Sequence, residues 1–456
     1  MSQKPSTAYI GSISFSICEN MPRTTQAAYV FIPGKNWKLS LAELISFYEA
    51  RDVKFEVRQL SKEFFAASTE ENANVLAIAD LGGILKIGRA TADFATQTAE
   101  KAFLQRDKQA REQMRREIAA SGLINEMLEV ASGKTVFGVS VYCAEDLLRP
   151  VSKSIQRFVG SSIKQELAAH GRKSSFMGFS RTREQPQLSP VEVLKKNFVG
   201  TKAEILFCIG KKQTVTATTV AVHNPFEFQK RDVGKPRQRK IFAISPRLAK
   251  IMVNLASCTS GKLLLDPFCG VGTILQEALL AGTKVVGVDI NPWCVEAAIA
   301  NLEWLKKEYA FKEAEYAVVQ GDACRLTSKL EEVDCIATEP DLGPALRQVP
   351  TVPYAAKIVA KLEPLYYSFL KEAYRMLKKG GRLVLVTPYL RVRSGRPVTM
   401  PVVEKAIGIG FKRVYLFQEK VFAEDVAIKE EMAEMASFVD AEERHKVGRE
   451  IHVFQK

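Results

Sequence analysis

The stretch LLLDPFCGVGTILQEALLAGTKVVGVDINP, residues 263–292, decides the fold of this chain. An apolar run ends at Asp266, two glycines follow at Gly270 and Gly272, and a helical pattern begins near Thr273. A second apolar run ends at Asp289. Strand, glycine turn, helix and second strand form the start of a doubly wound α/β sheet, in which ligands meet bare backbone at the carboxyl ends of the strands.

The same alternation of short apolar runs and helical segments continues to the end of the chain. Because apolar runs separated by helices are typical of a parallel sheet covered on both faces, we expect one such domain over 246–456. Its strands are expected at 262–266, 283–289, 317–320, 334–338, 382–387 and 413–417, with a further strand at the end of 444–453.

The ligand of this turn is predicted from its carboxylates. Asp289 can accept hydrogen bonds from both ribose hydroxyls of an adenosine. A nicotinamide dinucleotide would need a third glycine where this chain has Leu275, and Asp266 would repel its pyrophosphate. The same carboxylate suits the ammonium of a methionine moiety, so we expect S-adenosylmethionine, with a purely structural turn as the alternative. The expected contacts are Asp266, Phe268, Gly270, Gly272, Thr273, Asp289, Ile290, Asp322 and Ala323.

Two further positions fit this interpretation. Asp322, after the third strand, can accept a hydrogen bond from an adenine amino group, although a Gly-Asp pair is often only a turn. The sequence TEPDLGP, residues 338–344, follows the fourth strand. Enzymes of this architecture hold a planar amine acceptor there.

Length and composition limit the class of protein. With 456 residues, 46% of them hydrophobic and 25% charged, the chain is expected to be a globular protein of two or three domains. It contains no apolar run long enough for a bilayer, and residues 1–26 lack a secretory signal pattern, so we expect a cytoplasmic protein with no membrane contact. The eight cysteines are dispersed without a CxxC pair, which argues against a disulfide framework and a metal site.

Basic residues are concentrated in the first half. Residues 1–245 carry a net charge of +12 and residues 246–456 one of +2. The excess favours a polyanionic partner, although a solvated basic surface is as compatible with it. The expected RNA phosphate contacts are Lys164, Arg172, Lys173, Lys195, Lys230, Arg231, Lys235 and Arg237, of which the last four lie in QKRDVGKPRQRK, an expected linker at 229–240.

The first half has mixed α and β patterns. We expect strands at 28–32, 55–60, 64–68 and 86–89, a helix at 39–48 capped by Ser40, and one exposed helix over 96–120 that could present Arg111, Arg115 and Arg116. A second α+β unit follows, with strands at 135–142, 174–180, 203–209 and 215–222 and helices at 151–170 and 190–198.

Taken together, the chain resembles the THUMP-containing RNA methyltransferases, closest to the tRNA guanine-10 N2-methyltransferases. The resemblance starts near residue 28 and rests on AYVFIPGKNWKLSLAEL (28–44), LGGILKIGR (81–89), FGVSVY (137–142), RDVGKPRQRKIFAISPRLAKIMVNLA (231–256), DPFCGVGT (266–273) and VGVDINP (286–292). It implies a polar tail (1–27), a ferredoxin-like domain (28–92), a THUMP-like domain that binds tRNA (93–222), a basic linker (223–245) and a Rossmann-like methyltransferase domain (246–456).

The chain departs from that family at the acceptor motif. The family usually has Asp or Asn, two prolines and an aromatic residue, where this chain has Glu339, Pro340, Asp341 and Leu342. We therefore expect Glu339, Pro340 and Asp341 at the reacting amine, with Leu342 in place of the aromatic platform that would stack on the base. Tyr354, Tyr366 or Tyr389 could compensate, although each fits a core or ordinary surface position as well.

Three functions remain open at this stage. The first is a methyltransferase acting on the exocyclic N2 amine of a tRNA guanine, with a possible small activating subunit. The second is an RNA-binding protein whose methyltransferase domain has lost its chemistry. The third is a DNA amino-methyltransferase, which leaves the first half of the chain unexplained.

Overall fold

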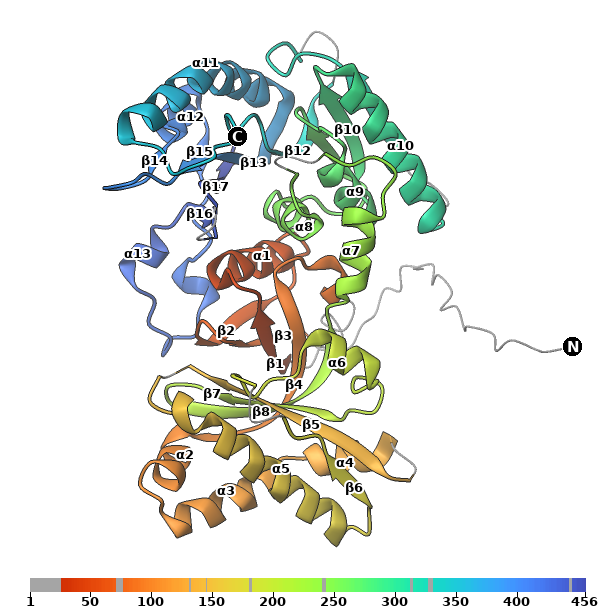
Figure 1. Cartoon of the computed structure of the whole chain (residues 1–456), viewed down its shortest axis with the longest axis vertical. Helices are drawn as coiled ribbons and strands as arrows, with labels where there is room; N and C mark the ends of the chain where they lie inside the picture. Colours follow the sequence, from red (N-terminus) through yellow and green to blue (C-terminus); the bar gives the residue numbers. More distant parts are fainter. Residues whose placement is uncertain are drawn as a thin grey trace, which may run out of the picture.

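The computed structural model describes residues 26–70, 77–130, 133–144, 146–179, 183–239, 243–311, 315–326, 331–442 and 445–456. The described chain forms three parts stacked along the long axis (Figure 1), with the second half of the sequence at one end and residues 96–209 at the other. Two large sheets organise these parts, and together they give the expected α/β class.

The first sheet is shared by the two parts built from the first half of the chain. Its strand order is β2-β3-β1-β4-β8-β7-β5-β6. The long strand β4 (Ile84–Ala95) joins the parts, because it pairs antiparallel with β1 on one edge and with β8 on the other. The remaining strands are β1 (Gln26–Pro33), β2 (Phe55–Leu60), β3 (Phe65–Glu70), β5 (Thr135–Cys143), β6 (Ser174–Phe176), β7 (Glu204–Ile209) and β8 (Gln213–Val222).

The first part has the strand order of a ferredoxin-like domain but draws one helix from elsewhere. Its own helix α1 (Trp37–Glu49) packs on β1, β2 and, from the second half of the chain, α8 (Pro246–Leu255). The carboxylate of Glu43, fully buried, accepts hydrogen bonds from the backbone N–H groups of Gly82 and Gly83 and from Asn254 Nδ2. Helix α8 is thereby fixed to the turn before β4, so the first part and the second half of the chain share one core.

The cap of α1 differs from the expectation. Asn36, not Ser40, is the N-cap, and its side chain accepts from Leu39 N–H. Ser40 lies inside the helix, where its hydroxyl donates to the carbonyl of Gly83. The helix begins two residues before the expected 39–48, because Trp37 and Lys38 form its first positions after the Asn36 cap.

The second part covers one face of β5 and β7 with helices. These are α2 (Thr96–Phe103), α3 (Lys108–Ala120), α4 (Leu123–Val130) and α5 (Ser152–Ala169). The short helix α6 (Pro190–Lys195) lies toward the other face, since Leu188 N–H, just before it, donates to Ser140 Oγ on β5. The single helix expected at 96–120 is wrong, since Asp107 caps a new helix by accepting from the N–H groups of Gln109 and Ala110. Arg111, Arg115 and Arg116 are exposed on α3.

The second sheet belongs to the second half of the chain and has the order β11-β10-β9-β12-β13-β17-β15. Six of these strands run in the same direction, only β17 among them is antiparallel, and this is the Rossmann-like arrangement of methyltransferases. The strands are β9 (Leu263–Asp266), β10 (Lys284–Asp289), β11 (Tyr316–Gln320), β12 (Val333–Thr338), β13 (Leu377–Leu390), β15 (Lys412–Arg413) and β17 (Val447–Gln455), with β14 (Val398–Thr399) and β16 (Ser437–Asp440) at the margins.

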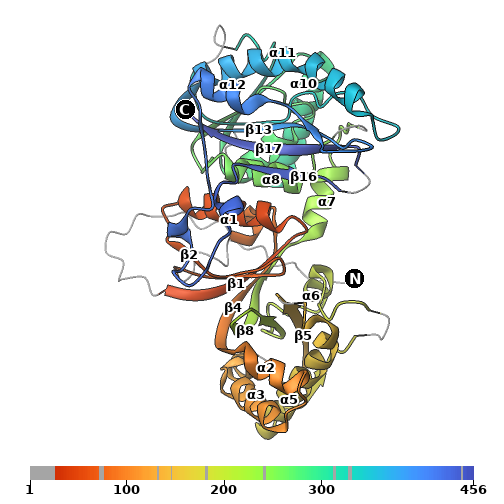
Figure 2. The ribbon, with the colours of Figure 1, turned by 90° about the vertical axis from the view of Figure 1, so that its left-hand side faces the viewer.

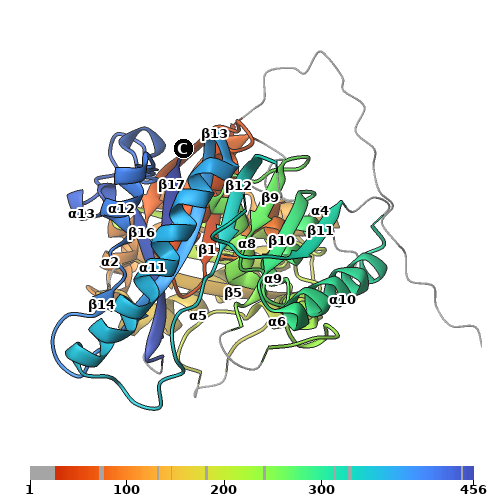
Figure 3. The ribbon, with the colours of Figure 1, turned by 90° about the horizontal axis from the view of Figure 1, so that it is seen from above.

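Helices cover both faces of this sheet, as Figures 2 and 3 show. Helices α8, α9 (Thr273–Leu280) and α10 (Pro292–Glu308) pack on the face that carries Leu264. Helices α11 (Val352–Met376) and α12 (Val402–Ile409) pack on the face that carries Leu265. A short helix, α13 (Glu430–Ala433), belongs to a segment that runs back to the first part, where Ala423 N–H donates to Val57 O.

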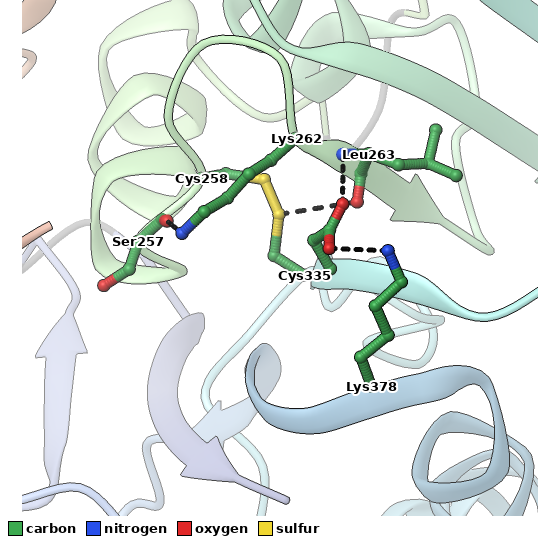
Figure 4. The surroundings of a disulfide bond; sticks show 7 residues. Ser257, Cys258, Lys262, Leu263, Cys335 and Lys378 are labelled. Carbon is green, nitrogen blue, oxygen red and sulfur yellow. Dashed lines mark hydrogen bonds and ion pairs between the residues drawn. A yellow bond between two sulfur atoms is a disulfide. The ribbon is translucent and has the colours of Figure 1, made fainter.

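A disulfide bond joins Cys258, just after α8, to Cys335 on β12 (Figure 4). The dispersed cysteines led us to expect no disulfide framework, and the bond between Cys258 and Cys335 corrects that expectation. The two residues are 77 apart in sequence, and only the packing of α8 against β12 brings them together. Around it, Asp334 accepts from Leu263 N–H and from Lys378.

Within the described ranges, no helix combines the length and the apolar character needed to cross a bilayer. The same ranges contain no group of three or more His, Cys, Asp or Glu side chains placed to hold a metal ion.

Candidate active site

Four acidic residues meet at one edge of the second sheet. Strands β9, β10, β11 and β12 are parallel, and the register aligns Gly287 with Asp266 and Asp289 with Gln320. Their carboxyl ends therefore lie side by side, so Asp266, Asp289, Asp322 and Glu339 follow them at the same edge. The negative charges of Asp289 and Glu339 both act on Asp266, which shows how closely these groups are placed.

The glycine turn joins β9 to α9 beneath these acids. Gly270 (φ 52°) and Gly272 (φ 83°) have left-handed backbone conformations that side chains rarely adopt. Gly272 also lies close to α10, since an added Cβ would come within 3.2 Å of Ala298 Cβ. Gly270 N–H donates to Asp289 Oδ2 at 2.9 Å, which fixes the turn to the end of β10.

Asp266 is the most buried of the four acids, with 1% of its surface exposed. Its Oδ1 accepts from Thr338 Oγ1 at 2.7 Å and from Phe268 N–H at 3.2 Å. Burial raises the pKa of this carboxyl to about 7, against the opposing effect of these hydrogen bonds. The neighbouring carboxylates raise it further, so a cationic ligand would relieve an unfavourable charge arrangement.

The residues expected at the adenosine lie along the same edge. Asp289 Oδ1 accepts from Asn291 N–H, and Asp322 Oδ1 accepts from Cys324 N–H, which orients both carboxylates. Ile290 exposes 71% of its surface beside Asp289, an unusual position for an isoleucine. Ala323, in contrast, is buried in the core.

The fourth acid, Glu339, forms an ion pair that the sequence did not indicate. Arg449 on β17 donates from Nε and Nη2 to the two oxygens of Glu339, at 2.5 and 3.1 Å. Both side chains are largely buried, exposing 10% for Glu339 and 16% for Arg449. Burial raises the pKa of Glu339, while Arg449 and then Arg239 act to lower it.

The rest of the acceptor motif is divided between surface and core. Pro340 is buried, and Asp341 is exposed, with its Oδ1 accepting from Gly343 N–H. Leu342 is 4% exposed and packs in the core, so it offers no surface for a base. Among the three tyrosines considered as substitutes, Tyr366 is buried, Tyr389 is half-buried and Tyr354 exposes 50% of its surface.

The expected linker is part of this site instead of a free connection. Residues Pro225–Val233 form helix α7, and the following segment runs along the glycine turn. Lys235 Nζ donates to Thr273 Oγ1 at 2.9 Å, while Asn301 bridges the carbonyls of Arg237 and Val271. Arg239 follows close enough to Glu339 to favour its ionised form.

Two of the expected RNA contacts are wrong because their side chains are buried. Arg231 pairs with the fully buried Glu277 on α9, and Lys235 is held by Thr273. Each exposes only 4% of its surface, so neither can reach a phosphate in this conformation. Lys230 pairs with Glu308 on α10, and both guanidinium nitrogens of Arg172 donate to carbonyls at Gly133 and Leu128. The exposed members of the set are Lys164, Lys173, Lys195 and Arg237.

The segment that contains these residues is similar to known methyltransferase domains. Residues 236–393 match the family model described as an RMKL-like, methyltransferase domain. Residues 152–300 match a model described as a DNA methylase, a match that ends before Glu339. The first match includes the glycine turn and all four acids.

Two curated relatives are named as tRNA methyltransferases. The chain is 38% identical over 165 residues to the tRNA (guanine(10)-N2)-dimethyltransferase of Methanothermobacter thermautotrophicus, covering 35% of this chain and 44% of the relative. It is 32% identical over 197 residues to the enzyme of the same name from Pyrococcus abyssi, covering 43% and 51%. The chain thus matches about half the length of these relatives.

Among solved structures, TrmN from Thermus thermophilus aligns with a TM-score of 0.46 and 15% identity, covering 95% of this chain and 100% of that one. The family model and the curated relatives agree with the motifs quoted from the sequence: residues 236–393 are similar to an RMKL-like methyltransferase domain, and the chain resembles the tRNA (guanine-10 N2)-methyltransferases.

Proposed function

We propose that this protein is an S-adenosylmethionine-dependent tRNA methyltransferase that acts on the exocyclic N2 amine of a guanine, at position 10 by its resemblance to the relatives. The observation that carries the proposal is the meeting of Asp266, Asp289, Asp322 and Glu339 at the carboxyl edge of one parallel sheet, beside a left-handed glycine turn.

The residues present fit that cofactor. The buried carboxylate of Asp266 has no cationic partner among the described residues, and carboxylates surround it, so a ligand bearing an ammonium group would stabilise it. An added Cβ at Gly270 would meet nothing within 4 Å, which leaves space above the turn. Asp289 and Asp322 would hold the ribose and adenine, Ile290 would cover the adenine, and Phe268 and Thr273 would complete the wall.

The chain's own residues would position the amine. When bound, the cofactor supplies a methyl group already activated by its sulfonium. Glu339 and the carbonyl of Pro340 would accept hydrogen bonds from the amine and so turn its lone pair toward the methyl group, which is positioning more than covalent catalysis. The raised pKa of Glu339 makes it a better acceptor for the surplus proton than an exposed carboxylate. Asp341, at the rim, would border the entering base.

The RNA would bind to the first half of the chain. Lys164, Lys173 and Lys195 are exposed on the second part, and Arg237 lies near the glycine turn. We assign the ranges 28–92, 93–222 and 246–456 to ferredoxin-like, THUMP-like and methyltransferase domains, and a cytoplasmic location follows from a tRNA substrate. Whether a small activating subunit is required is a question for the same assay.

An RNA-binding protein without catalysis is the second candidate, and two observations favour it: Leu342 is buried and Glu339 is already paired with Arg449. Incubating the protein with labelled S-adenosylmethionine and an unmodified tRNA transcript, then identifying the nucleosides by mass spectrometry, separates the candidates. N2-methylguanosine supports the enzyme. Tight tRNA binding without turnover supports the second candidate, and turnover on duplex DNA alone would indicate a DNA methyltransferase.

A further inference from the structure

The ion pair between Glu339 and Arg449 places hydrogen-bond acceptors and donors side by side where the base to be methylated would bind. We propose that this pair selects guanine by binding its Watson–Crick edge, with Arg449 donating to O6 and Glu339 accepting from N1–H and N2–H. The inference rests on the proposed function, and it adds a specificity residue, Arg449, from a strand that carries none of the motifs.

The pair has hydrogen-bonding capacity left for a base. Arg449 uses Nε and Nη2 toward Glu339, and its Nη1 makes no hydrogen bond to the residues that the structure describes. An arginine has five N–H donors and an ionised carboxylate about four lone-pair positions, so donors remain on Arg449 and acceptor positions on Glu339. Because both side chains are largely buried, a base that left these groups unpaired would bind poorly.

Neighbouring charged groups act on both members of the ion pair. Asp440 on β16 lies opposite Arg449 in the strand register and attracts it, and Arg239 attracts Glu339 from the linker. Asp440 also repels Glu339, and Asp266 and the hydroxyl of Tyr366 are further titratable groups that interact with it. Two anions therefore flank Arg449 and two cations act on Glu339, which fixes an arginine and a carboxylate next to each other.

Guanine is the base whose edge matches this order. It presents an acceptor (O6), a donor (N1–H) and a donor amine (N2–H2). Adenine and cytosine present an amine where the site has arginine donors, and a bare ring nitrogen where the site has a carboxylate. A flipped base is commonly recognised through this edge, and a site built to hydrogen-bond one edge rejects analogues that lack it strongly.

The test replaces the methylated guanine by 2,6-diaminopurine. That base keeps the N2 amine but has an amine in place of O6 and no N1–H. The analogue is introduced by ligation into the tRNA position that the wild-type protein methylates, and kcat/KM is measured for both RNAs. Wild type, Arg449→Met and Arg449→Lys are compared with Arg375→Met, a control that removes an exposed arginine paired with Glu372 on α11. Unfolding curves identify any variant that fails to fold, and Arg449→Lys then takes the place of Arg449→Met.

We expect the wild type and Arg375→Met to prefer guanine by about 100-fold or more. Arg449→Met should reduce that preference by about tenfold or more, since a hydrogen bond from a charged group contributes about 1.5–3 kcal/mol, with Arg449→Lys between them. Equal rates on both RNAs in the wild type, or a full preference in a folded Arg449 variant, would overturn the inference. Failure of the wild type to methylate guanine in any RNA would instead overturn the proposed function.

Discussion

The raised pKa of Asp266 makes cofactor binding depend on pH in a calculable way. Burial places this pKa at about 7 in the free protein. If the carboxylate form of Asp266 binds the ligand's ammonium, the free protein must lose a proton from this group before or during binding. Affinity is then full above pH 7 and falls as the pH drops below it, by a factor that approaches ten per pH unit.

The magnitude follows from that value. Between pH 7.5 and pH 5.5 the dissociation constant should rise about 25-fold, equivalent to about 1.9 kcal/mol. The same shift predicts that the stability of the ligand-free protein falls as the pH rises from about 4 to about 7, because in that range only the folded protein keeps the proton on Asp266.

Isothermal titration calorimetry with S-adenosylhomocysteine, in buffers of different ionisation enthalpy, measures both the affinity and the protons released. Asp266→Asn is the matched variant, because it keeps a similar shape without the titrating group. We expect weaker binding at pH 7.5 and little pH dependence in Asp266→Asn. A wild-type affinity that is constant from pH 5.5 to 7.5, or an unchanged pH dependence in the variant, would refute the assignment of the ammonium to Asp266.

Three further predictions concern the acceptor site, the RNA surface and the junction of the two N-terminal parts. Glu339→Gln should lower kcat by about 10² to 10⁴-fold while S-adenosylhomocysteine binds with nearly unchanged affinity; a normal kcat in a single-turnover assay would remove Glu339 from the mechanism. Charge reversal of the exposed Lys164, Lys173 and Lys195 should weaken tRNA binding and flatten its salt dependence in filter-binding titrations. Lys212→Glu, at an exposed lysine paired with Asp425, is the control, and equal salt slopes for the two variants would contradict the assignment of these lysines to the RNA-binding surface. Lys86 and Glu204 form a fully buried ion pair between β4 and β7, so Lys86→Met alone should destabilise the fold by about 3–5 kcal/mol, whereas Lys86→Met combined with Glu204→Leu should destabilise it much less. Equal midpoints of urea unfolding for the single variant and the wild type would show that this ion pair does not stabilise the junction.

The second half of the chain was largely predictable because its signals are local. A strand that ends in an acid, a glycine turn and a helix within thirty residues leave few alternatives, and β9, α9 and β10 formed where residues 263–289 indicated. The first half was predictable in its strands, yet α2 and α3 were merged, since a break at Asp107 interrupts little of the helical composition.

What the sequence could not indicate are contacts between distant residues. Arg449 and Glu339 are 110 positions apart, and only the antiparallel insertion of β17 beside β13 brings them together. In the same way, Arg231 and Lys235 have the composition of a phosphate-binding linker, but the buried Glu277 and the turn at Thr273 hold them inside. Charge counts do not distinguish a buried cation from an exposed one.

The central claim is that the acidic edge of the second sheet binds S-adenosylmethionine with its methyl group directed at Glu339. A crystal structure of the protein with S-adenosylhomocysteine tests it most directly. We expect the ribose on Asp289, the adenine beside Asp322 and Ile290, and the amino group near Asp266. A ligand bound elsewhere, or bound at this edge with its sulfur facing away from Glu339, would contradict the account.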